Sequence, residues 1–91
     1  MPQVPANPSE VDNAGTAIGA ARRRLDEIDD HIIDLLRQRR EVSRKIQRIR
    51  LGAGGARQDA VRETVVVERY RSALGAPGDA LAAALLAICR G

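Results

Sequence analysis

Aromatic residues are nearly absent from this sequence: it has no Phe and no Trp, and Tyr70 is its one tyrosine among 91 residues. A hydrophobic core must therefore be aliphatic, built from Ile, Leu, Val and Ala, a composition that favours helices. The one cysteine, Cys89, excludes an intramolecular disulfide. The one histidine, His31, has no second histidine and no nearby cysteine to join it, so we expect no metal site.

Long apolar runs are also missing, and no stretch approaches the length of a membrane span. The first residues, MPQVPANPSE, lack the basic start and apolar run of a signal peptide. We therefore expect a cytoplasmic protein without membrane contact. Three prolines among the first eight residues predict a disordered arm over residues 1–10, followed by a single domain over residues 11–91.

The strongest pattern in the chain is an apolar seam between residues 18 and 49. Its positions alternate three and four residues apart, as on one face of a long amphipathic helix. They are Ile18, Ala21, Leu25, Ile28, Ile32, Leu35, Arg39, Val42, Ile46 and Ile49. Arg39 alone is charged, and a guanidinium in an apolar seam requires an anionic or hydrogen-bonding partner.

Three helices are expected, and the fold class is all-α. Gly52, Gly54 and Gly55 stop the first helix, Asp59 is a suitable N-cap for the second, and Asp79 for the third. Gly75 and Pro77 close the second helix. The expected ranges are about 11–51, 59–74 and 79–90.

The first helix is too long for the other two to cover. Residues 18–50 would extend roughly 50 Å, whereas a compact domain of this length has a radius of gyration of about 12 Å. Another copy of the chain must then cover part of the seam. We expect an intertwined helical homodimer; the simpler alternative is a parallel two-stranded coiled coil.

Charged residues on two helices are placed to form an anion site. Arg39 and Arg50 are eleven residues apart, close to three turns, and lie on nearly the same helix face. Asp59, Arg62 and Glu63 fall in the first turn of the second helix, which the glycine-rich linker folds back toward Arg50. These side chains suit a small polyanion that also carries a hydrogen-bond donor.

Arg22 cannot reach this site within its own chain, because it lies roughly 42 Å from Arg50 along the helix. In an antiparallel dimer it can reach the site of the other chain. That arrangement places the two-fold axis near residue 33 of each long helix.

The run RRRLDEIDDHIIDLLRQRREVSRKIQRIR, the glycine-rich linker and the segment RQDAVRE resemble the all-α (type II) chorismate mutases. These are small three-helix enzymes that form intertwined dimers. The resemblance extends from about Ala17 to Arg90 without a gap. Six residues fall on the family's active-site positions: Arg22, Arg39, Arg50, Asp59, Arg62 and Glu63.

The resemblance implies catalysis of the Claisen rearrangement of chorismate to prephenate, a step in aromatic amino acid biosynthesis that needs no cofactor. Arg22 of the partner chain, Arg39 and Arg62 would hold the carboxylates. Arg50, where many members have lysine, would hydrogen-bond the ether oxygen. Glu63, helped by Asp59, would receive the ring hydroxyl.

The third helix departs from the family pattern. The best-known members place a serine and a glutamine there, whereas this helix carries only Cys89 and Arg90 beyond its cap. Arg90 is therefore a further candidate for the site, as in the short actinobacterial members. Those members are activated by docking on a 3-deoxy-arabino-heptulosonate-7-phosphate synthase, which the resemblance implies as a partner here.

Other functions remain open from the sequence. A 4-amino-4-deoxychorismate mutase or an isochorismate pyruvate lyase would use a similar arginine set on the same fold. The non-enzyme alternative is a basic helical dimer that binds nucleic acid. The net charge of +3, with twelve acidic residues among fifteen basic ones, and the lack of aromatic stacking residues argue against that alternative.

Overall fold

The computed structural model describes residues 8–55 and 59–90, and the side chains of residues 13–55 and 59–90. Over these residues the protein consists of three helices without a strand: α1 (Pro8–Gly52), α2 (Ala60–Leu74) and α3 (Ala76–Arg90). The all-α prediction is therefore confirmed. No helix in the described part is both long and apolar enough to cross a membrane.

The chain forms two compact units, Met1–Asp34 and Leu35–Gly91, and α1 contributes residues to both. α1 begins at Pro8, so the prediction of a disordered arm over residues 1–10 is wrong for residues 8–10. Proline is compatible with this position because the first turn of a helix leaves its N–H groups without intrahelical partners. Residues 1–7 of the expected arm lie outside the described residues.

α1 ends in a Schellman motif formed by the glycine-rich linker. The Gly55 N–H donates to the Arg50 carbonyl at 2.7 Å, and the Gly54 N–H donates to the Leu51 carbonyl at 3.1 Å. Gly54 has a φ of 82°, which glycine adopts without steric cost. The expected stop is confirmed, and it fixes the backbone at Arg50.

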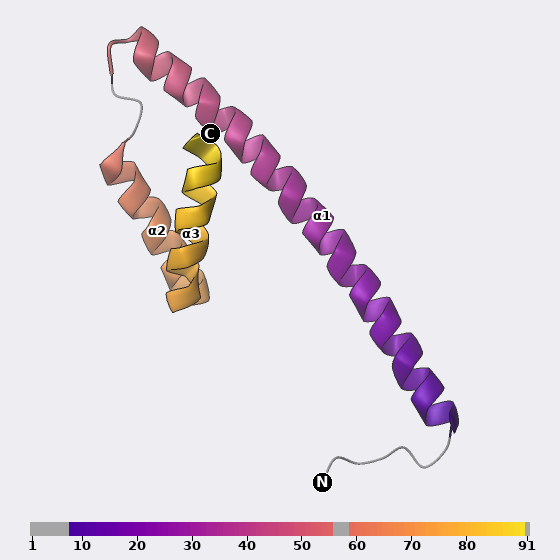
Figure 1. Ribbon diagram of the computed structural model, residues 1–91. Helices are drawn as coiled ribbons and strands as arrows, with labels where there is room; N and C mark the ends of the chain where they lie inside the picture. The colour runs from indigo at the N-terminus through magenta and orange to yellow at the C-terminus, as the bar shows by residue number, and fades with distance from the viewer. Residues whose placement is uncertain (1–7, 56–58, 91) are drawn as a thin grey trace. The chain divides into compact units, whose positions relative to one another are not determined.

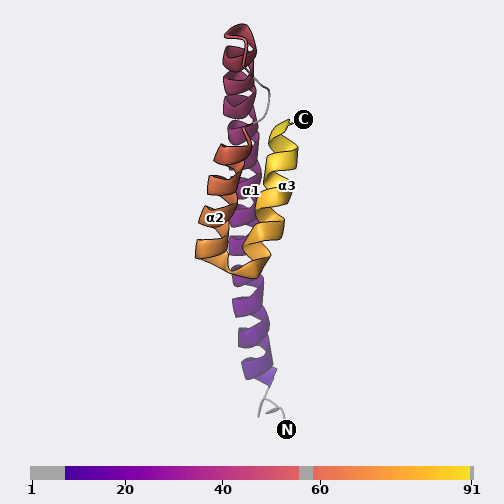
Figure 2. The same ribbon diagram turned by 90° about the vertical axis from the view of Figure 1, so that its left-hand side faces the viewer.

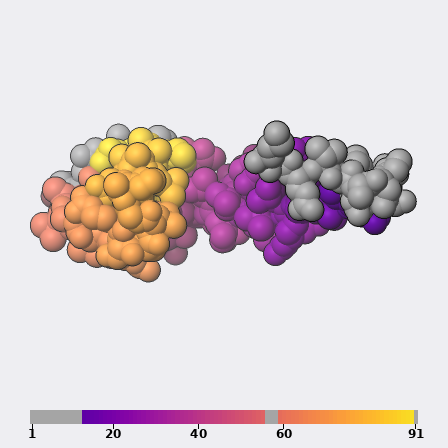
Figure 3. Space-filling model, turned by 90° about the horizontal axis from the view of Figure 1, so that it is seen from below, coloured from indigo at the N-terminus to yellow at the C-terminus, as the bar shows by residue number. Residues whose placement is uncertain are grey.

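α2 and α3 form an antiparallel hairpin and lie side by side (Figures 1 and 2). Gly75 caps α2 with a φ of 75°, and its N–H donates to the Arg71 carbonyl at 2.8 Å. Gly78 lets the helices approach closely, because a Cβ at this position would overlap the Tyr70 carbonyl. The α2 and α3 side chains accordingly form one close-packed group in the space-filling view (Figure 3).

The start of α3 differs from the prediction. The helix begins at Ala76, so Pro77 lies in its first turn, where a missing N–H has no cost. Asp79 is therefore not the N-cap. Its carboxylate instead receives two hydrogen bonds from Arg71, at 2.8 Å and 2.7 Å, which join the two helices beside the turn.

The core of the described residues lies in the hairpin. Its buried hydrophobic side chains are Val66, Ala82, Leu85 and Cys89. Leu81 and Ile88, although apolar, are 48% and 42% exposed. The small residues Gly78 and Ala82 face α2 instead because they permit the close approach of the two backbones.

Candidate active site

One cavity of about 240 Å³ is lined by residues of all three helices, every one of them within the Leu35–Gly91 unit. Five of the six active-site residues expected from the sequence line it, together with the further candidate Arg90. The charged lining residues are Arg39, Arg50, Asp59, Arg62, Glu63 and Arg90. Four guanidinium groups against two carboxylates leave this cavity with a net charge of +2, so it favours an anion.

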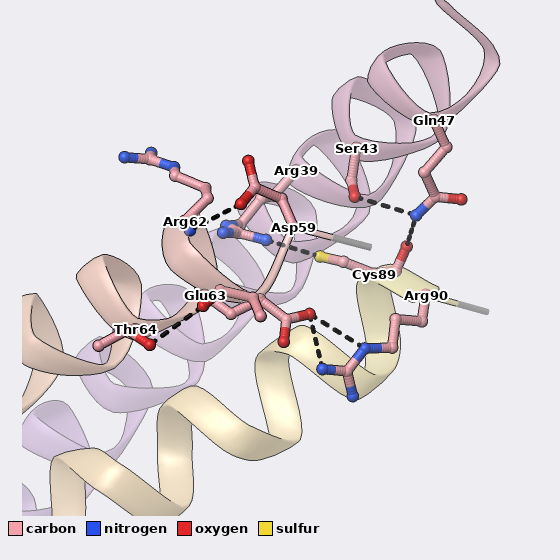
Figure 4. A network of polar contacts seen from close by, with 10 residues as sticks. Arg39, Ser43, Gln47, Asp59, Arg62, Glu63, Thr64, Cys89 and Arg90 are labelled. Carbon is pink, nitrogen blue, oxygen red and sulfur yellow. Dashed lines mark hydrogen bonds and ion pairs between the residues drawn. The ribbon is translucent and has the colours of Figure 1, made fainter. Parts of the chain in front are cut away.

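Arg39 finds its partner at the C-terminal end of α3. Its Nη1 donates to the Sγ of Cys89 at 3.0 Å, a contact between residues fifty positions apart (Figure 4). Cys89 is buried, with 2% of its surface exposed. The C-terminal end of a helix also carries a partial negative charge, which stabilises a nearby guanidinium.

Arg50 is oriented by the N-cap of α2. Its Nη2 donates to the Oδ2 of Asp59 at 2.6 Å, while the Oδ1 of Asp59 accepts the Arg62 backbone N–H at 3.1 Å. The predicted capping role of Asp59 is therefore confirmed. The Arg62 N–H and, next, the Arg50 guanidinium hold the pKa of Asp59 below its usual range. An Asp59 carboxylate that is ionised at neutral pH can keep Arg50 turned toward the cavity.

Glu63 pairs with the last described residue of α3. Its Oε1 accepts hydrogen bonds from the Nη2 of Arg90 at 2.6 Å and from the Nε at 3.2 Å (Figure 4). The Glu63 side chain is 26% exposed, so its carboxylate remains accessible from the cavity. Arg62 lies one residue earlier on α2, and its side chain extends away from this ion pair (Figure 4).

Arg22 belongs to the other compact unit, Met1–Asp34, and is exposed. It is not among the lining residues of the cavity. Its role in the site of a partner chain stays a prediction.

The sequence reasoning missed two polar lining residues of α1, Ser43 and Gln47. The Nε2 of Gln47 donates to the backbone carbonyl of Cys89 at 3.3 Å and to the Ser43 Oγ at 3.5 Å. Ser43 and Gln47 lie four and eight residues after Arg39, which places them on the same face of α1. This spacing is the sequence feature from which their place in the cavity could have been predicted.

Comparisons with known proteins agree on one family. The family described as chorismate mutase type II matches residues 21–90. An intracellular chorismate mutase of Mycolicibacterium smegmatis is 42% identical over 87 residues, covering 96% of this chain and 83% of the relative. An intracellular chorismate mutase of Mycobacterium tuberculosis is 42% identical over 74 residues, covering 81% of this chain and 70% of the relative.

A solved structure is similar as well, with a TM-score of 0.82 and 31% identity over 86% of this chain and 94% of the other. It is described as a non-covalent complex of DAHP synthase and chorismate mutase from Corynebacterium glutamicum with a bound transition state analog. The family match covers α2, α3 and most of α1, including every charged residue that lines the cavity. This chain therefore belongs to the type II chorismate mutase family.

Proposed function

We propose that this chain catalyses the Claisen rearrangement of chorismate to prephenate in the cavity between its three helices. The observation that carries the proposal is the convergence of Arg39, Arg50, Arg62 and Glu63 on one cavity. Chorismate carries two carboxylates, a ring hydroxyl and an ether oxygen. The net charge of +2 in the cavity complements this dianion, and the Glu63 carboxylate supplies an acceptor for the hydroxyl.

The reaction is unimolecular and requires no nucleophile. The protein can accelerate it by holding the chair-like conformer and by placing positive charge where the breaking ether bond gathers negative charge. Arg39 and Arg62 would bind the carboxylates. Arg50 has five N–H donors and contacts Asp59 through Nη2, so donors on its other nitrogens can reach the ether oxygen.

Arg90 is proposed to hold the carboxylate of Glu63 in place for the substrate. Two of its nitrogens contact a single oxygen, Oε1, and this leaves Oε2 available to the ring hydroxyl. In this role Arg90 takes a position at the third-helix end of the site, where the better-known members of the family use other polar residues.

The second chain of a homodimer would complete the site. The apolar seam of α1 is exposed in the single chain: Ile18 is 51%, Leu25 58% and Leu35 61% exposed. Exposed aliphatic residues along a helix favour association with a second helix. We propose an antiparallel pair of α1 helices that cross near residue 33 and bring Arg22 to the partner's cavity, with residues 11–91 acting as one catalytic domain.

The similar Corynebacterium structure contains a DAHP synthase together with the chorismate mutase. By analogy, we propose a DAHP synthase as an activating partner of this chain. The relatives are named intracellular chorismate mutases, which supports the cytoplasm as the site of action.

The test is the loss of chorismate absorbance by purified protein, alone and with the synthase, with chromatographic identification of the product. Prephenate is the expected product. Arg39→Ala and Arg62→Ala should abolish turnover while helicity and dimer mass stay unchanged, and Arg48→Ala, next to the lining residue Gln47, is the matched control. Chorismate left intact in both conditions would refute the proposal. Conversion of isochorismate alone, with release of pyruvate, would assign the lyase instead.

A further inference from the structure

Gln47 connects the middle of the site to the end of α3. It lies on α1 between Arg39 and Arg50, eight residues after the first and three before the second, on the face that lines the cavity. Its carboxamide nitrogen donates to the Cys89 carbonyl at 3.3 Å. Because a carbonyl can only accept, this contact also fixes which end of the carboxamide faces α3.

The Cys89 carbonyl needs such a donor. It is one of the last four carbonyls of α3, and these have no intrahelical partner. A buried carbonyl left without a partner costs free energy, so Gln47 stabilises the last turn of α3 in its position against α1. The second contact of the same nitrogen, to the Ser43 Oγ, holds the carboxamide from its own helix.

Two charged residues of the cavity depend on this last turn. Arg39 donates to the Sγ of Cys89, and Arg90 holds Glu63 (Figure 4). A shift of the turn would therefore move a carboxylate-binding guanidinium and the hydroxyl acceptor together. We propose that Gln47 is a positioning residue, which sets Arg39 and Glu63 by tying the last turn of α3 to α1. This inference rests on the proposed mutase function.

Cys89 can report directly on the contact between Gln47 and the last turn of α3, because it is the one cysteine of the chain and is buried. A hydrogen bond contributes about 0.5–1.5 kcal/mol, which corresponds to a change of roughly two- to tenfold in an opening equilibrium. In Gln47→Ala the reaction of Cys89 with a thiol-disulfide reagent such as dithiobisnitrobenzoate should be faster by this factor. Gln47→Glu keeps the shape but removes the donor, and it should react faster as well.

The kinetic readout should divide between KM and kcat. The carboxylate that Arg39 binds is fully charged in both the ground state and the transition state, so a displaced Arg39 weakens binding of both. KM should rise roughly two- to tenfold in Gln47→Ala, with kcat within about twofold of wild type. Arg48→Ala, the exposed neighbour on α1, should change neither KM nor the reactivity of Cys89.

Equal Cys89 reactivity in Gln47→Ala and Arg48→Ala would overturn the proposal, provided circular dichroism shows the same helix content. Faster Cys89 reaction with an unchanged KM would also overturn it, because the last turn would then not position the site. Inactive wild-type protein would refute the mutase function instead. The thiol reaction would still decide whether Gln47 holds α3.

Discussion

Gly78 lies where α2 and α3 leave no room for a Cβ. A Cβ at this position would overlap the Tyr70 carbonyl and lie 3.0 Å from the Arg71 nitrogen. Both neighbours are backbone atoms of α2, so neither can move away by a side-chain rotation. Gly78→Ala therefore requires α3 to shift as a whole.

The cost follows from two opposing effects. Overpacking of a close contact typically costs about 1–3 kcal/mol, whereas alanine gains about 0.5–1 kcal/mol over glycine within a helix. The net loss should be about 1–2 kcal/mol, and each kcal/mol lowers the Tm of a domain of this size by roughly 4–8 °C. Thermal melting followed by circular dichroism, at one protein concentration throughout, measures the shift.

Gly15→Ala is the matched control, because it is also a helical glycine but a Cβ there meets no atom within 4 Å. It should leave the Tm unchanged or raise it slightly. The close packing of α2 on α3 would be refuted if Gly78→Ala melted at or above the wild-type temperature.

Two further predictions concern charged residues. Two carboxyl groups have a pKa below the ordinary 3.8: that of Asp59, lowered chiefly by the hydrogen bond from the Arg62 N–H, and that of Asp79, lowered chiefly by the hydrogen bond from Arg71. At low pH the folded state therefore binds fewer protons than the unfolded state. This stabilisation is complete above the unfolded pKa values and is lost as the pH falls through the folded values, so the Tm should decrease below about pH 4. Asp79→Asn should reduce this decrease in Tm. An equal decrease in the variant would contradict the role of Asp79. Arg90→Ala should lower kcat/KM by about tenfold, because Glu63 loses the charge-assisted contacts that hold it. Arg71→Ala, which lies outside this cavity, should leave kcat/KM unchanged. Steady-state kinetics with chorismate measure both effects, and an equal kcat/KM in the two variants would contradict the role of Arg90.

Much of the fold could be predicted because its signals are local. The seam of α1, the cap at Asp59 and the glycine stop all depend on residues a few positions apart. The start of α3 was predicted three residues late, since Pro77 fits a helix end and a helix start equally well, and only the tertiary contact of Asp79 with Arg71 distinguishes them.

The residues that line the cavity could be predicted where they follow the family pattern at regular helical spacing. Arg39, Arg50, Arg62 and Glu63 line one cavity as expected. The contacts of Arg39 with Cys89 and of Gln47 with the Cys89 carbonyl join residues fifty and forty-two positions apart. No local pattern encodes them, because they depend on how the end of α3 packs against α1.

The most direct test of a catalytic site shared between two chains is the activity of a heterodimer made from Arg22→Ala and Arg39→Ala chains. One of its two sites combines an intact Arg39 with an intact Arg22, while the other site lacks both. The heterodimer, isolated with two affinity tags, should recover about half of the wild-type rate of prephenate formation, although each variant homodimer is inactive. A heterodimer of Arg39→Ala and Arg62→Ala chains should stay inactive, because each chain then lacks a residue of its own cavity. No recovery in the first heterodimer, or equal recovery in both, would contradict the shared site.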